Sequence, residues 1–168
     1  MDLKLQKALN KQINMEFYSS YLYMSMSAEC ETLELNGFAN WFLVQSQEEQ
    51  THGMKIYKYL VQKGVEIELE SIKKPENGFK STLAMMKASL EHEELMSRSF
   101  NELSDLAMEL RDHSTYNFLQ WFVNEQIEEE ATTGNLLTKV KRAGSNDSLI
   151  YMLDRELESR TFIDETAN

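Results

Sequence analysis

Apolar residues recur at helical spacing along almost the whole chain, and four long stripes can be followed. Apolar positions three or four residues apart are the repeat of an α-helix that buries one face. The stripes consist of Leu5, Leu9, Ile13, Tyr23 and Cys30; Phe38, Phe42, Ile56 and Leu60; Phe79, Leu83, Met86, Leu90, Phe100, Leu103 and Ala107; and Phe118, Phe122, Leu136 and Val140. They predict four helices of roughly 27–30 residues, each about 40 Å long.

The segments between the stripes predict how the helices are arranged. A few residues near Gly37 join the first two helices, and residues 111–113 join the last two, which are lengths typical of antiparallel hairpins. The middle segment, residues 65–78, contains Pro75 and can span about 45 Å when extended. Because that length is enough to return along the whole bundle, we expect the second and third helices to be parallel.

The sequence therefore predicts an all-α fold, a four-helix bundle over about residues 5–143 with one long crossover. A short fifth helix over about residues 146–158 follows, with Leu149, Leu153 and Leu157 on one side. We expect residues 1–168 to form a single domain. One proline and 6 glycines are too few for the frequent turns of an all-β chain.

Composition excludes several classes of function. The 28 acidic and 17 basic residues leave a formal charge of −11, which argues against nucleic acid or an anionic membrane as a partner and permits cation binding. No run of residues is apolar and long enough to be a signal peptide or a membrane span. The single cysteine, Cys30, excludes an internal disulfide framework and an iron–sulfur cluster, and we expect it to lie in the core. A reducing compartment, the cytoplasm, fits best.

Ionisable and amide side chains interrupt the apolar stripes near the middle of every long helix. Glu16 lies seven residues from both Leu9 and Tyr23, so it shares their helix face. The corresponding interruptions in the other three helices are Glu49 and His52, Glu93, and Gln126 and Glu129. Each helix is therefore expected to direct at least one metal-binding group into the core.

The spacing of these residues forms a repeat. Glu16 and Glu49 are 33 positions apart, as are Glu93 and Gln126. Within one helix, Glu49 and His52 are three positions apart, as are Gln126 and Glu129. Adding 77 to the number of Glu16, Glu49 or His52 gives the number of Glu93, Gln126 or Glu129, respectively. Each hairpin then places one carboxylate level with an i, i+3 pair on its other helix.

Four carboxylates in an apolar bundle need compensation, because each unpaired buried charge costs several kcal/mol. The stripes hold few cations, so we expect two divalent ions there; oxygen-rich ligation with one imidazole favours iron over manganese or zinc. Taken singly, each residue has a plainer interpretation: Glu-x-x-His is common on helix surfaces, residues 125–130 could be a solvated acidic face, and Tyr23 could be a core aromatic. The repeat is what favours a metal site. We expect His92 and His113 to be surface residues.

At these positions the chain resembles a prokaryotic non-haem ferritin. The similarity is carried by residues 9–23, by Gln47-Glu48-Glu49-Gln50-Thr51-His52, by His92-Glu93, and most specifically by residues 116–130. It covers nearly the whole chain except the last few residues. Haem-containing bacterioferritins carry a methionine where this chain has Gln50, and Glu-x-x-His where it has Gln126 and Glu129, so the resemblance implies no haem.

The resemblance also implies roles for individual residues. Glu16, Glu49 and His52 would bind a first iron; Glu49 would bridge to a second, held by Glu93 and Glu129 with Gln126 beside it. Tyr23 would lie near the pair and could donate an electron. A third, transit site would use Glu48, Glu125, Glu128 and Glu129. The family oxidises ferrous iron with dioxygen or hydrogen peroxide and stores the ferric mineral in a shell of 24 identical subunits, whose fifth helices line the four-fold axes.

Two other functions stay open on the sequence alone. A di-iron oxygenase or peroxidase acting on another substrate would need an open pocket beside the metals, where Tyr23, Phe42, Phe100 and Phe122 are expected to fill the space. A metal-free helical scaffold that only binds partners would neither take up iron nor form a large assembly.

Overall fold

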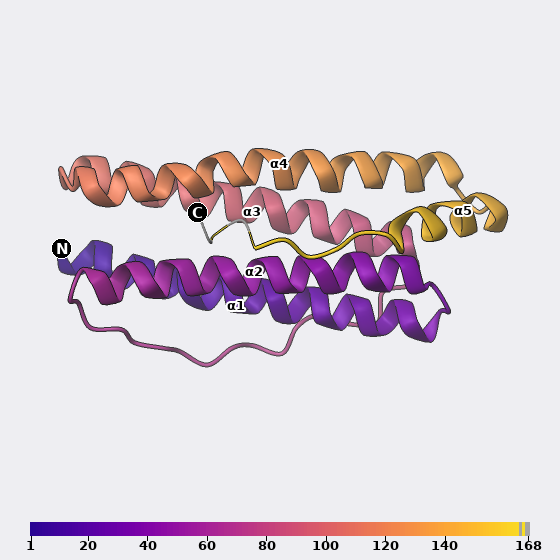
Figure 1. The fold of residues 1–168 in the computed structure, drawn as a ribbon, viewed down its shortest axis with the longest axis horizontal. Helices are drawn as coiled ribbons and strands as arrows, with labels where there is room; N and C mark the ends of the chain where they lie inside the picture. Colours follow the sequence, from indigo (N-terminus) through magenta and orange to yellow (C-terminus); the bar gives the residue numbers. More distant parts are fainter. Residues whose placement is uncertain (165, 167–168) are drawn as a thin grey trace.

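The computed structural model describes residues 1–164 and residue 166, and in that part of the chain it contains five helices and no strand (Figure 1). α1 packs along α2 and α3 packs along α4, while α5 contacts α2 and α4. The helices are α1 (Leu3–Thr32), α2 (Asn36–Gln62), α3 (Thr82–Glu109), α4 (His113–Ala143) and α5 (Asp147–Leu157). The predicted all-α bundle with a short fifth helix is confirmed. None of these five helices has the length and apolar character that a membrane span requires.

The long crossover, residues 63–81, returns along the length of the bundle, so α2 and α3 run in the same direction as predicted (Figure 1). Polar side chains of α1 hold it in place. The Asn10 carboxamide accepts a hydrogen bond from the Glu68 backbone N–H at 3.0 Å, and its Nδ2 donates to the Glu66 carbonyl at 3.3 Å. At the other end the Glu29 carboxylate accepts from the backbone N–H groups of Gly78 and Phe79. These bonds satisfy backbone groups that an irregular segment would otherwise leave unpaired.

The two short loops share one backbone conformation, and the 77-residue repeat relates them. α1 and α3 end at residues 32 and 109, and α2 and α4 begin at residues 36 and 113. In the described part of the chain, Glu34 and Arg111 are the non-glycine residues with positive φ, at 59° and 54°. The N–H groups of Leu35 and Asp112 bond to the carbonyls of Cys30 and Ala107, respectively, at equivalent positions. Each hairpin therefore turns in the same register, which fixes the level at which its helices face each other.

The apolar core has two parts. One cluster, near the α1–α2 loop, includes Met26, Cys30 and Phe42, and the other, near the α3–α4 loop, includes Ile56, Phe100 and Phe122. The predicted burial of Cys30 is confirmed. The buried carboxylates described below occupy the level between the two clusters, so apolar packing on both sides holds the helices around them.

The start of α2 depends on α5. Side chains of Asp2, Ser81, Asp112 and Asn146 cap the other four helices, whereas Leu35, the residue before α2, offers no capping bond. Instead the buried Asp154 carboxylate on α5 accepts a hydrogen bond from the Phe38 N–H at 2.9 Å. An anion at this position also suits the positive end of the helix dipole. Gly37 allows the close approach, because a Cβ atom there would lie 1.7 Å from the Asp154 carbonyl oxygen.

Replacing this cap should loosen α5. We expect Asp154→Ala to lower the free energy of unfolding by about 1–2 kcal/mol, since the Phe38 N–H loses its partner inside the protein. Backbone amides of residues 147–157 should exchange faster with deuterium, as measured by mass spectrometry. Asp147→Ala, in the exposed first turn of α5, is the matched control and should cost only a few tenths of a kcal/mol. Equal effects of the two substitutions would contradict the capping role.

Candidate metal centre

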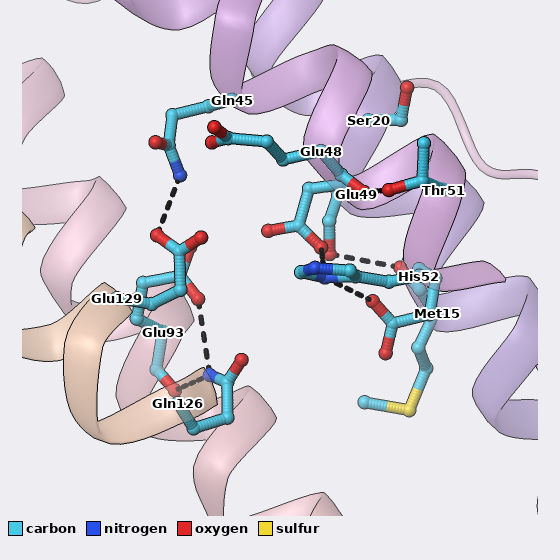
Figure 2. Close-up of polar contacts among 12 residues, drawn as sticks. Met15, Ser20, Gln45, Glu48, Glu49, Thr51, His52, Glu93, Gln126 and Glu129 are labelled. Atoms are coloured by element: carbon cyan, nitrogen blue, oxygen red, sulfur yellow. Dashed lines mark hydrogen bonds and ion pairs between the residues drawn. The ribbon is translucent and has the colours of Figure 1, made fainter. Parts of the chain in front are cut away.

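All six residues that interrupt the stripes lie buried at the middle level of the bundle. They come from all four long helices, and none is more than 6% exposed: Glu16, Glu49, His52, Glu93, Gln126 and Glu129. Figure 2 shows Glu49 and His52 facing Glu93 and Glu129 across the space between the hairpins. The prediction that each helix directs such a group into the core is confirmed.

Three of these residues form a compact donor set. Glu16, Glu49 and His52 each offer one atom within 4.8 Å of the others. His52 Nδ1 lies 3.8 Å from Glu16 Oε2 and 3.5 Å from Glu49 Oε2. Gln12 Nε2 donates to Glu16 Oε1 at 2.7 Å, while Glu16 Oε2 and Glu49 Oε1 are enclosed and accept no hydrogen bond. Two oxygens without partners beside an imidazole nitrogen are suited to a metal ion.

The opposite hairpin holds its carboxylates with neutral donors. Gln45 Nε2 donates to Glu129 Oε2 at 2.8 Å, and Gln126 Nε2 donates to Glu93 Oε2 at 3.2 Å (Figure 2). Tyr23 donates its hydroxyl hydrogen to Glu93 Oε1. Glu93 and Glu129 lie outside the compact set of Glu16, Glu49 and His52, on the other side of Glu49.

Burial and mutual repulsion disfavour the charged forms of these carboxylates. Burial raises the pKa of Glu16 well above its ordinary value, and the neighbouring Glu49 carboxylate raises it further. Burial likewise raises the pKa of Glu49, with added repulsion from Glu93 and Glu129. Glu93 follows the same direction, since burial and the Glu129 carboxylate raise its pKa. In the part of the chain that the structure describes, no Lys or Arg forms an ion pair with any of the four. A bound cation would remove this repulsion.

A second group of acidic residues opens from this centre toward the face formed by α2 and α4. We call this group the third acidic cluster, because its members are the residues expected at the third iron site: Glu48, Glu125, Glu128 and Glu129. They line one pocket of about 90 Å³ that also reaches His52. The structure thus brings together the four residues expected at a transit site. It also places Arg160 there, because Arg160 Nη2 lies 2.7 Å from Glu48 Oε2. That arginine was not expected from the sequence.

The chain is similar in sequence to known ferritins. A ferritin-like domain model matches residues 6–143. The chain is 38% identical over 161 residues to a bacterial non-heme ferritin of Staphylococcus aureus, covering 96% of this chain and 97% of that protein. The bacterial non-heme ferritin of Staphylococcus haemolyticus matches with the same identity and coverage. The chain belongs to the ferritin family.

This ferritin also superposes on solved archaeal structures. A closed form of the Archaeoglobus fulgidus ferritin, engineered by site-directed mutagenesis, matches with a TM-score of 0.96 and 39% identity over 97% of this chain and 99% of that one. A humanized archaeal ferritin matches with a TM-score of 0.96 and 42% identity over the same shares of the two chains. The resemblance inferred from the residues is therefore confirmed at the level of family and fold.

The prediction that His92 lies on the surface of this ferritin is wrong. His113 is exposed as expected, but His92 is largely enclosed between α1 and α3. Its Nε2 lies 2.7 Å from Ser19 Oγ, and its ring packs about 6 Å from the rings of Tyr18 and Tyr23. Burial lowers the pKa of His92 to about 4, so it is neutral at pH 7. Tyr23 therefore has two aromatic neighbours, because the His92 ring meets it edge-on and the Phe42 ring stacks on it, each with ring centroids 6.1 Å away.

The raised pKa of Glu49 predicts that its negative charge destabilises the metal-free protein. Glu49→Gln keeps the side-chain shape without the charge, so in metal-free buffer at neutral pH we expect it to melt a few degrees higher than the wild type. The difference should grow as the pH rises above about 4.5. An unfolded glutamate loses its proton there, while the folded Glu49, with its raised pKa, retains it, so the wild type loses stability as the pH rises toward that folded pKa.

Circular dichroism melts in the presence of a chelator, recorded at several pH values, measure this difference. Glu94→Gln is the control, because Glu94 is an exposed residue of α3; this variant should leave the melting temperature within about a degree of the wild type. A variant less stable than the wild type at every pH would show that Glu49 is not under repulsion.

Proposed function

We propose that this ferritin stores iron and oxidises it at the buried centre. The observation that carries the proposal is the set of four enclosed carboxylates and one imidazole with no Lys or Arg partner among the described residues. Such a set is costly in a metal-free bundle and becomes favourable when two cations bind. The relatives that match nearly the whole chain are named ferritins, which supports iron as the cargo.

We assign the two ions as follows. Glu16, Glu49 and His52 hold the first ferrous ion, since their donor atoms already converge. Glu49 bridges to the second, which Glu93 and Glu129 hold from the other hairpin. Gln126 and Gln45 keep these two carboxylates in place, and their amide groups are weaker ligands than carboxylates.

The redox step transfers one electron from each ferrous ion. Dioxygen takes the two electrons and two protons and becomes hydrogen peroxide; if hydrogen peroxide is the oxidant, the same two electrons and two protons give two water molecules. Carboxylate oxygens are hard ligands, so they stabilise the ferric product more than the ferrous substrate. Tyr23, hydrogen-bonded to Glu93, lies where it can supply a further electron.

Ferric iron then leaves through the third acidic cluster, which shares Glu129 and a pocket with the buried centre. The pocket of about 90 Å³ is far below the roughly 300 Å³ of an ordinary small-molecule site. A larger groove of about 570 Å³ between α3 and α4 touches the centre only through Gln126. Ions fit this geometry better than an organic substrate does, so storage is favoured over an oxygenase.

We further propose that the whole chain acts as one unit in the cytoplasm and that 24 copies form a hollow shell. α5 exposes Leu149 and Met152, three positions apart on one side of the helix, and also Tyr151; a neighbouring subunit would cover these apolar side chains. Storage of a mineral requires an enclosed volume that one bundle lacks.

Substitution at the centre should stop catalysed oxidation. We expect Glu49→Ala and His52→Ala to reduce the oxidation of ferrous iron to the rate in buffer alone, because the first ion loses one of three ligands. Stopped-flow absorbance after mixing with aerobic ferrous iron measures the rate. Glu94→Ala and His113→Ala remove the same groups from exposed positions and should retain the wild-type rate. A wild-type rate in either centre variant would overturn the assignment.

The assembly can be measured directly. With a chain of 19.6 kDa, we expect a single species of about half a megadalton by analytical ultracentrifugation, which stains for iron after loading. A monomer or dimer with no stainable iron would support the scaffold function instead.

A further inference from the structure

The chain after α5 folds back over the bundle. Residues 158–164, called here the C-terminal segment, run beside α2 on the side that faces α4, in the same direction as α2 (Figure 1). Asn40 contacts the beginning of this segment, and Ile163 reaches the pocket lined by Thr51 and His52. Residues 158–163, when extended, span about 20 Å, which is enough to cover the roughly 17 Å along α2 from residue 40 to residue 51.

Specific contacts hold the C-terminal segment in this path. Asn40 Nδ2 donates to the carbonyls of Leu157 at 3.1 Å and Arg160 at 2.9 Å. The Arg160 guanidinium lies 5.1 Å from the Trp41 ring, within the range of a cation–π contact. The hydrogen bonds from Asn40 and the contact with Trp41 together hold the Arg160 guanidinium against the bundle.

The arginine head ends in the pocket of the third acidic cluster. Arg160 Nη2 donates to Glu48 Oε2 at 2.7 Å, and the two side chains are 24% and 19% exposed, respectively. The same pocket is lined by His52 and Glu129 of the buried centre, so the guanidinium shares one cavity with two residues of that centre. A permanent positive charge therefore occupies a place where carboxylates would otherwise attract a metal ion.

We propose that Arg160 is a built-in cation of the third acidic cluster, which an iron ion must displace from Glu48 in order to bind there or to pass between the buried centre and the α2–α4 face. The inference rests on the proposed function for the identity of the ion. The step is an exchange of one cation for another, with no bond made to carbon and no electron transferred. At rest the guanidinium offsets part of the repulsion among the carboxylates, and it lowers their affinity for metal by the strength of the Glu48 ion pair.

The exchange predicts a gain in affinity when the arginine is removed. Zn²⁺ is a suitable probe because it has no redox chemistry at this centre. In calorimetric titrations of the full chain with Zn²⁺, Arg160→Gln should bind the third ion about fivefold more tightly than the wild type, the range expected for a partly exposed ion pair. The third binding event is assigned by its loss in Glu128→Gln. Arg155→Gln removes the same charge from an exposed ion pair with Glu158 and should leave the third affinity unchanged.

A double-substitution cycle separates exchange from simple release of the C-terminal segment. If Arg160 competes with metal for Glu48, the gain from Arg160→Gln disappears in a Glu48→Gln background. A gain that persists there, an equal gain in Arg155→Gln, or a third affinity within twofold of the wild type would each overturn the inference. The proposed function fails by a different result, namely no oxidation of ferrous iron by the wild type, and the Zn²⁺ cycle can still succeed in that case.

Discussion

Four carboxylates are enclosed at the middle of an apolar bundle, and among the described residues no lysine or arginine forms an ion pair with any of them. The rest of the structure serves to tolerate that arrangement. Repulsion among them would separate the two hairpins if only their own level held the helices together. Apolar clusters on both sides of this level supply the packing that resists it. Helices of 27 to 31 residues are long enough to carry a cluster at each end and a polar level between them.

The neutral donors explain how the centre keeps its shape without a cation. Gln12, Gln45, Gln126 and Tyr23 each give a hydrogen bond to a carboxylate, which orients the group and adds no net charge. A lysine in the same place would bind the carboxylate more strongly and would compete with the ion. Hydrogen bonds from amide and phenol groups are weak enough to let the carboxylates bind a metal ion. They are also strong enough that the buried carboxylates are not left without any hydrogen-bond partner.

Much of this could be predicted from the sequence, and the failures have physical causes. Apolar periodicity specified the helices, and the repeat of Glu16 in Glu93 identified the buried carboxylates, because both signals lie within single helices or hairpins. The amides of Gln12 and Gln45 were missed, although each lies four residues before a glutamate of the centre and so shares its helix face. His92 and Arg160 could not be placed in this way. The burial of His92 depends on how α3 packs against α1, and the position of Arg160 depends on the path of an irregular segment.

The repeat that relates the two hairpins is exact in the loops but not in the centre. The same turn closes both hairpins. In the centre, however, the position equivalent to Glu49 holds a glutamine, Gln126, and the position equivalent to His52 holds a glutamate, Glu129. An unbroken repeat would have created two interchangeable positions related by approximate two-fold symmetry. Only one hairpin carries an imidazole, so the two halves of the centre offer different sets of ligand atoms. Two ions bound there would therefore differ in coordination and in affinity.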